Sequence, residues 1–132
     1  ANSIAISQNK NRISIVGGDF SHDQVKEQNF ERLDRFIHPH SENKTKRKTH
    51  YFWNINKKTS SPNGYKSCVQ FITNKKLVVC GTSGVDFSAD GGVTWKYISS
   101  QSFHVLKVQP GTQNVFFAGP GGKIGRLNFD NL

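Results

Sequence analysis

Short runs of alternating apolar and polar residues, separated by turn-forming residues, recur along the whole chain. The run 3–7 alternates in this way, and the turn-prone segment 9–11 leads from it into the apolar run 12–16. The same order of strand, turn, strand and following glycine returns at 65–81 and again at 103–119. Because a period of two residues is typical of a half-buried β-strand, the pattern predicts three consecutive β-hairpins.

The glycine that follows each hairpin gives the length of the repeat. Gly81 and Gly119 are 38 residues apart, which is close to the repeat of about 40 to 45 residues in propellers built of four-stranded blades. Gly17 and Gly81 are 64 residues apart, so the first repeat is longer by 26 residues. When the aromatic strand 51–55 is aligned with the strand 95–98, most of the additional residues fall between positions 23 and 50.

This insertion, residues 24–50, has a composition of its own. Ser21 to Gln24 match a helix-capping box, and the apolar residues after it are spaced as on one face of a short helix that Pro39 would end. These apolar residues are Val25, Phe30, Leu33, Phe36 and Ile37. A basic run follows, with Lys44, Lys46, Arg47 and Lys48. Such a run is compatible with a solvated loop and with a docking surface for an acidic partner.

The stretch from Ser88 to Trp95 joins two further strand-like runs. Its central Asp90-Gly91-Gly92 supplies a carboxylate that can accept main-chain N–H groups and two residues free to adopt positive φ, so the stretch predicts a hairpin. Five of its residues match every fixed position of the Asp box, namely Ser88, Asp90, Gly92, Thr94 and Trp95. The chain here resembles the β-propellers that carry this motif. The resemblance implies that the box is structural, with the Trp95 side chain packed inward.

Three other stretches make the resemblance more specific. Residues 16–21, 64–69 and 80–86, together with the box, are similar to the last blades of bacterial propellers related to the photosystem II stability and assembly factor. The similarity covers most of the chain outside residues 24–50. It implies an all-β fold of four-stranded antiparallel blades and a non-catalytic scaffold for protein binding or complex assembly, without implying which partner is bound.

The number of predicted strands sets the expected domain organisation. We expect residues 1–132 to form the C-terminal portion of a single propeller, with a first blade at 1–58 that carries the insertion, a second at 65–100 and a partial third at 102–130 that lacks its outer strand. About three blades form an incomplete ring, because closed propellers have about 4 to 8. The missing blades would come from the rest of a longer chain or from another copy. The expected partner contacts are the basic run and an exposed loop with Thr82, Ser83 and Asp86.

The main alternative is a sialidase-like glycoside hydrolase or a carbohydrate-binding propeller, because these proteins also carry Asp boxes. A sialidase needs clustered arginines to hold a carboxylate and a tyrosine nucleophile paired with an acid. The sequence places four of its arginines in a turn or in the insertion, and the five are Arg12, Arg32, Arg35, Arg47 and Arg126. This distribution favours a protein without catalytic activity, and we assign no catalytic residue and no cofactor. We also favour no metal site among the histidines, which include His22, His38, His40 and His50.

Charge and composition bear on three further questions, namely nucleic-acid binding, a membrane span and the location of the protein. The formal net charge is +9, and most of it lies outside the insertion and is spread over the strands, which argues against a dedicated nucleic-acid track. No run of about 18 apolar residues is present, so no membrane-spanning helix is predicted. The absence of Met, at position 1 as elsewhere, suggests a processed chain or part of a longer one. The compartment stays open, and a periplasmic or secreted location is favoured over a cytoplasmic one.

The two cysteines fall on strands predicted to pair with each other. A four-residue loop at 73–76 would set Cys80 opposite Val69, with Cys68 on the other face, whereas a three-residue loop would set Cys68 opposite Cys80. Both registers remain open at this point. The second would allow a disulfide, but we favour two buried thiols.

Overall fold

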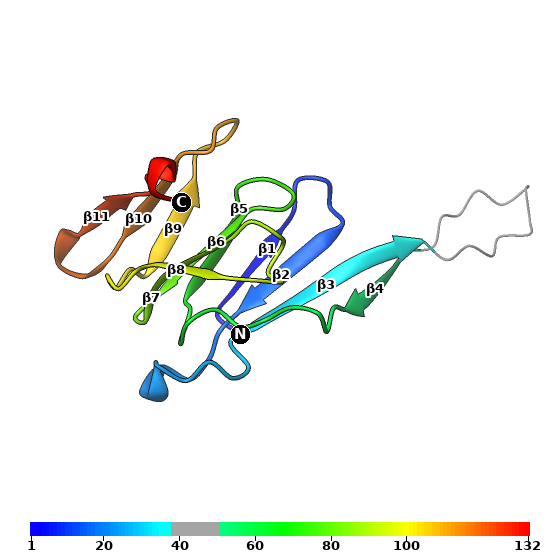
Figure 1. Ribbon diagram of the computed structural model, residues 1–132, viewed down its shortest axis with the longest axis horizontal. Coiled ribbons are helices and arrows are strands. Elements are labelled where there is room, and N and C mark those ends of the chain that lie inside the picture. The colour runs from blue at the N-terminus through cyan, green and yellow to red at the C-terminus, as the bar shows by residue number, and fades with distance from the viewer. Residues whose placement is uncertain (38–50) are drawn as a thin grey trace, which may run out of the picture.

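The computed structural model describes residues 1–37 and 51–132, and three antiparallel β-sheets make up most of it (Figure 1). The first sheet has the order β1-β2-β3-β4, the second β5-β6-β7-β8 and the third β11-β10-β9. The strands are β1 (Ser3–Ile6), β2 (Arg12–Val16), β3 (Phe30–Ile37), β4 (Tyr51–Ile55), β5 (Cys68–Phe71), β6 (Leu77–Gly81), β7 (Gly84–Ser88), β8 (Lys96–Ser99), β9 (Val105–Val108), β10 (Val115–Ala118) and β11 (Ile124–Arg126). Single 3-10 turns lie at Phe20–His22, Pro120–Gly122 and Phe129–Asn131. The predicted all-β fold of antiparallel sheets is therefore confirmed, and the described strands close no ring.

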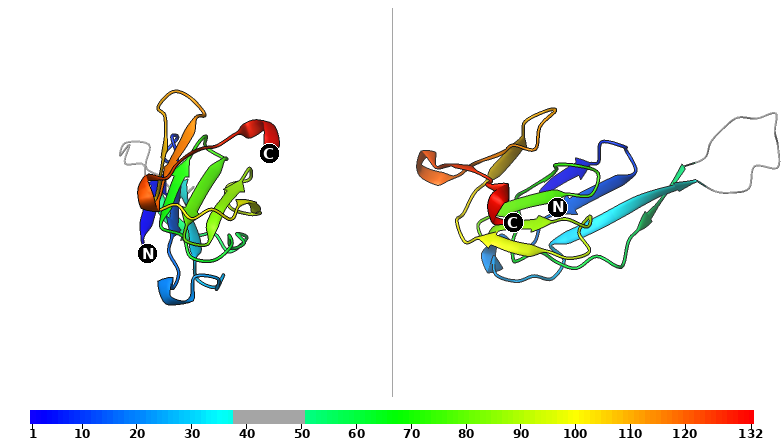
Figure 2. Two further views of the ribbon diagram at one scale, coloured as in Figure 1. Left: turned by 90° about the vertical axis from the view of Figure 1, so that its left-hand side faces the viewer. Right: turned by 45° about the horizontal axis from the view of Figure 1, so that its top comes forward.

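The sheets follow one another side by side (Figures 1 and 2). β1 and β2 contact β5, and β5 and β6 contact β9. A small cluster of Val16, Val69 and Val79 fills the space between the first and second sheets, with Ala5, Phe30 and Trp95 packed around it. A larger cluster joins the second and third sheets, and it contains Ile72, Val78, Cys80, Val85, Phe87, Phe103, Leu106, Val115 and Phe117. The second sheet is thus covered on both faces.

The helix expected between positions 24 and 37 is wrong. Residues 30–37 form β3, which pairs with β2 on one side and with β4 on the other. A helix of this length is marginal in water, whereas β3 gains a ladder of hydrogen bonds on both edges. The capping box is not formed either, because Ser21 lies inside the 3-10 turn at Phe20–His22 and is not its N-cap residue. The N-cap is Asp19, whose side chain accepts from Ser21 N.

Strand β3 also shows where the first sheet differs from the second. In the second sheet the Asp box connects the third and fourth strands, β7 and β8. In the first sheet the connection from β3 to β4 is the segment 38–50, which lies outside the described residues. The predicted strand 51–55 is confirmed as β4, the outer strand of a complete four-stranded sheet.

The register of β5 and β6 is the one that sets the cysteines opposite each other. Cys68 pairs with Cys80 and Phe71 with Leu77, and Ile72 N donates to Lys76 O to close the turn. Both cysteines are free thiols.

In residues 1–37 and 51–132 we find no helix with the length and apolar character that a membrane crossing requires.

Candidate functional site

The Asp-box hairpin is held by its own side chains. Ser88 Oγ donates to Asp90 Oδ1 at 2.8 Å and accepts from Gly92 N at 2.8 Å. Asp90 Oδ1 also accepts from Thr94 N at 2.9 Å, and Asp90 Oδ2 accepts from Thr94 Oγ1. Partial burial raises the pKa of Asp90, but the hydrogen bonds from Thr94 and Ser88 outweigh it and leave the pKa lowered. Both carboxylate oxygens are therefore occupied inside the hairpin.

The outer surface of the same hairpin holds the first sheet in place. The Trp95 ring packs edge-on against Phe30 of β3, with 4.9 Å between centroids, and Trp95 Nε1 donates to Ser60 O. Gly92 has a φ of +89°, and a Cβ at this position would lie 2.5 Å from the Phe30 ring. The box is thus a contact between two sheets as well as a turn, and glycine is required at position 92 for both reasons.

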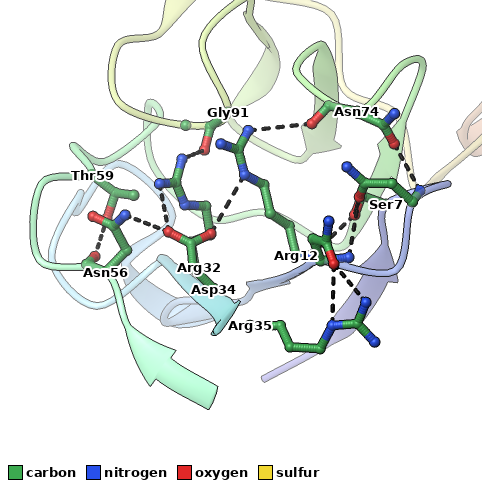
Figure 3. Close-up of polar contacts among 12 residues, drawn as sticks. Ser7, Arg12, Arg32, Asp34, Arg35, Asn56, Thr59, Asn74 and Gly91 are labelled. Carbon is green, nitrogen blue, oxygen red and sulfur yellow. Dashed lines mark hydrogen bonds and ion pairs between the residues drawn. The ribbon is translucent and has the colours of Figure 1, made fainter. Parts of the chain in front are cut away.

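Two arginines share one carboxylate beside the box, and we call Arg12, Arg32 and Asp34 the Asp34 cluster (Figure 3). Arg32 Nη2 lies 2.8 Å from Asp34 Oδ2, and Arg12 Nε lies 3.4 Å from Asp34 Oδ1. The remaining donors point to main-chain carbonyls: Arg32 Nη1 donates to Gly91 O at 2.7 Å and Arg12 Nη1 to Asn74 O at 3.3 Å. The cluster therefore connects strands β2 and β3 to two loops of the second sheet.

The Asp34 cluster was missed at the sequence level, although its signal is present. Arg12 and Asp34 are cross-strand partners in β2 and β3, and Arg32 and Asp34 are two residues apart on one face of β3. Opposite charges in these positions attract each other. The pairing could be recognised only if 30–37 was taken as a strand, and we had expected a helix there.

A second buried charge lies in the second sheet. Lys66 is fully buried, and its Nζ lies 2.7 Å from Asp86 Oδ2 on β7 and donates to Ser83 Oγ at 2.9 Å and Gly84 O at 3.1 Å. Asp86 Oδ1 accepts from Asn63 N. Burial lowers the pKa of Lys66, while the neighbouring Asp86 acts in the opposite direction.

The expectation of an exposed contact loop at 82–86 is wrong. Ser83 is 3% exposed and Asp86 2% exposed, and Thr82 is half-buried. The polar groups of Ser83 and Asp86 bind the Lys66 ammonium group instead, a role that the local sequence does not indicate because lysine side chains usually reach solvent. The other expected contact residues, Lys44, Lys46, Arg47 and Lys48, lie outside the described residues.

The histidines bring no metal ligands together in the part of the chain that the structure describes. His22 Nδ1 lies 2.8 Å from Asp19 Oδ2 on the surface, and no group of three His, Cys, Asp or Glu residues forms within 1–37 and 51–132. His38, His40 and His50 lie outside these ranges.

The outer face of the first sheet, which points away from the second sheet, is apolar and open. We define it by side chains that neighbour one another across the strands: Ile4, Ile6, Ile13, Ile15, Leu33, Tyr51, Trp53 and Ile55. Ile4 is 63% exposed and Ile6 60%, whereas Ser14 and Val16, on the opposite face of β2, are buried against the second sheet. Glu31 and Arg35 are the charged residues on the outer face of β3.

Arg35 and Tyr51 organise one end of this outer face. The Arg35 guanidinium lies 4.1 Å from the centroid of the Tyr51 ring. Its Nη2 donates to Asn11 Oδ1 at 2.7 Å. Stacking and hydrogen bonding thus fix a cation at the edge of an apolar surface.

The sequence matches no known protein family and no curated protein. The geometry of the described chain is therefore the basis for any functional conclusion, and its most prominent unexplained feature is the outer face of the first sheet.

Proposed function

We propose that the chain is a non-catalytic, propeller-type scaffold that binds protein and supports complex assembly. The observation that carries the proposal is the outer face of the first sheet. Soluble proteins rarely leave a continuous apolar surface of this kind open, and such surfaces mark sites of protein contact. The partner that we propose for this face is the set of missing propeller blades, supplied by a longer chain or by another copy.

The internal contacts of the chain indicate what kind of surface fits there. The second sheet packs its own apolar faces against the first and third sheets. An occupant of the outer face that is itself a β-sheet would repeat this arrangement. The third sheet leaves such a surface open, with Val105 54%, Phe116 43% and Ile124 80% exposed. Its basic neighbours Lys107 and Arg126 would face Glu31.

A second copy of the chain is therefore the partner with which the proposal is tested. In sedimentation equilibrium we expect the chain to associate with rising concentration. Ile4→Glu combined with Ile6→Glu is expected to abolish this association, because two charges would be buried in an apolar contact. Val25→Glu is the matched control, since Val25 is 45% exposed but lies outside the outer face. A wild-type chain that stays monomeric over the whole range, or a double variant that associates equally well, contradicts the proposal that a second copy occupies the outer face.

The glycoside hydrolase alternative gains no support from the arginines. The guanidinium groups of Arg12 and Arg32 bind Asp34 and main-chain carbonyls, and Arg35 stacks on Tyr51. A sialidase would direct such groups at an open substrate site. Turnover of a sialoside by the chain would favour the glycoside hydrolase over the non-catalytic scaffold.

A further inference from the structure

Cys68 and Cys80 occupy directly opposed positions on neighbouring antiparallel strands. They are Cα partners in the β5–β6 ladder. Opposed residues in such a ladder have Cα atoms about 4.5 to 5.5 Å apart, which falls inside the range of about 4.4 to 6.8 Å that disulfides require. The two side chains also share one face, because each belongs to the cluster between the second and third sheets.

The two thiols differ in access to solvent. Cys68 is half-buried, and its Sγ donates to Leu106 O at 3.7 Å. Cys80 is fully buried. The neighbouring Cys80 thiol lowers the pKa of Cys68 to about 6, while the neighbouring Cys68 and burial raise the pKa of Cys80. A reagent from solvent can thus reach Cys68 and would find Cys80 directly behind it.

We propose that Cys68 and Cys80 form a reversible intrachain disulfide, in which Cys68 is the attacking thiolate and Cys80 the resolving thiol. The oxidant is a small-molecule disulfide such as glutathione disulfide. The Cys68 thiolate attacks one of its sulfurs, so that a mixed disulfide forms and one glutathione thiolate leaves. Cys80 then attacks Cys68 Sγ, and the second glutathione leaves as a thiolate that takes up the Cys80 proton. The protein loses two electrons and two protons, and two glutathione molecules are the reduced product.

The crosslink would close a loop that also holds the first sheet. Within residues 68–80, Asn74 O accepts from Arg12 Nη1 and Asn74 Oδ1 accepts from Asn9 N. Lys75 O accepts from Gly91 N of the Asp box. Closing the loop reduces the freedom of the unfolded chain, so the oxidised protein should unfold at a higher temperature than the reduced protein.

The test treats the folded 132-residue chain with glutathione disulfide at neutral pH and measures its intact mass under non-reducing conditions. We expect a decrease of about 2 Da from loss of two hydrogens, a rise of several degrees in the unfolding temperature, and reversal of both by dithiothreitol. Cys68→Ser should show no mass change, because the remaining thiol, Cys80, is fully buried and glutathione disulfide cannot reach it. Cys80→Ala should instead retain a stable glutathione adduct on Cys68.

Three results would overturn the proposal. They are an unchanged mass in the wild type, a persistent glutathione adduct on wild-type Cys68, and a disulfide between two chains in place of the intrachain bond. The Cys80→Ala variant keeps the test decisive even if Cys68→Ser folds poorly, because it reports on the attack at Cys68 separately from the resolving step.

Discussion

Replacing Asp86 with Asn is expected to lower the free energy of unfolding by about 3 to 5 kcal/mol near neutral pH, the usual cost of breaking a buried ion pair from one side. Lys66 Nζ is fully buried 2.7 Å from Asp86 Oδ2. Asparagine retains the size of the side chain and an oxygen for Asn63 N. It removes the negative charge, so the ammonium group would face only the dipoles of Ser83 and Gly84. The loss is large relative to the total stability of a small domain, about 5 to 15 kcal/mol.

The same variant should regain stability as the pH rises. Burial lowers the pKa of Lys66 below its ordinary value of 10.5, and loss of the Asp86 carboxylate removes the main effect that opposes it. Between the folded pKa and 10.5 the unfolded state binds more protons than the folded state, so stability increases with pH. The gain for one such group is at most about 1.4 kcal/mol per pH unit. The difference from the wild type is therefore expected to shrink between neutral pH and about pH 10.

Urea unfolding followed by tryptophan fluorescence at several pH values measures both effects. Glu27→Gln is the matched control, because it makes the same change from acid to amide on an exposed side chain. Adding Lys66→Met to Asp86→Asn should restore part of the stability, since the unpaired cation is removed. A loss for Asp86→Asn below about 1 kcal/mol, as for an exposed pair, or a loss independent of pH, would refute this account of Lys66.

Two further predictions concern the Asp box. Gly92→Ala should lower the free energy of unfolding by about 1 to 3 kcal/mol, because the new side chain is strained at positive φ and clashes with Phe30. In urea unfolding this loss should exceed that of Gly111→Ala, where φ is also positive but no atom lies within 4 Å of the added Cβ. Equal losses in the two variants would argue against the clash. Asp90→Asn should make the stability of the fold less sensitive to acid. The lowered pKa of Asp90 stabilises the fold above the unfolded value of 3.8, and this contribution disappears as the pH falls through the folded pKa. Acid unfolding followed by circular dichroism measures the effect, and an unchanged acid sensitivity would contradict the importance of the Thr94 hydrogen bonds.

Local pattern predicted the strands and failed wherever a distant partner decides the outcome. Alternation along 12–16 and the turn residues around Gly91 are local signals, and both gave the observed elements. The apolar spacing from Phe30 to Ile37 suits a helix as well as a strand. What selects the strand is pairing with β2 and β4, whose residues are distant in sequence. The same limitation hid the Asp34 cluster, because its members become neighbours only once β3 is paired.

The burial of the charged pair Lys66 and Asp86 was also not predictable from the sequence. Nothing near Lys66 indicates that its ammonium group lies inside the protein, since its partner Asp86 is 20 residues away and was itself expected on the surface. The cysteine register was a narrower case. Two alternatives were already defined, and the hydrogen bond from Ile72 N to Lys76 O selects between them.

The pairing of Ile37 with Tyr51 has a consequence for how this chain can vary. The Cα atoms of opposed residues in an antiparallel pair lie about 4.5 to 5.5 Å apart, so the pairing places the end of β3 and the start of β4 next to each other. Five register pairs, from Leu33–Ile55 to Ile37–Tyr51, join the two strands. We therefore expect a foreign peptide inserted between these strands to leave their register unchanged, which makes the position a site for peptide grafting.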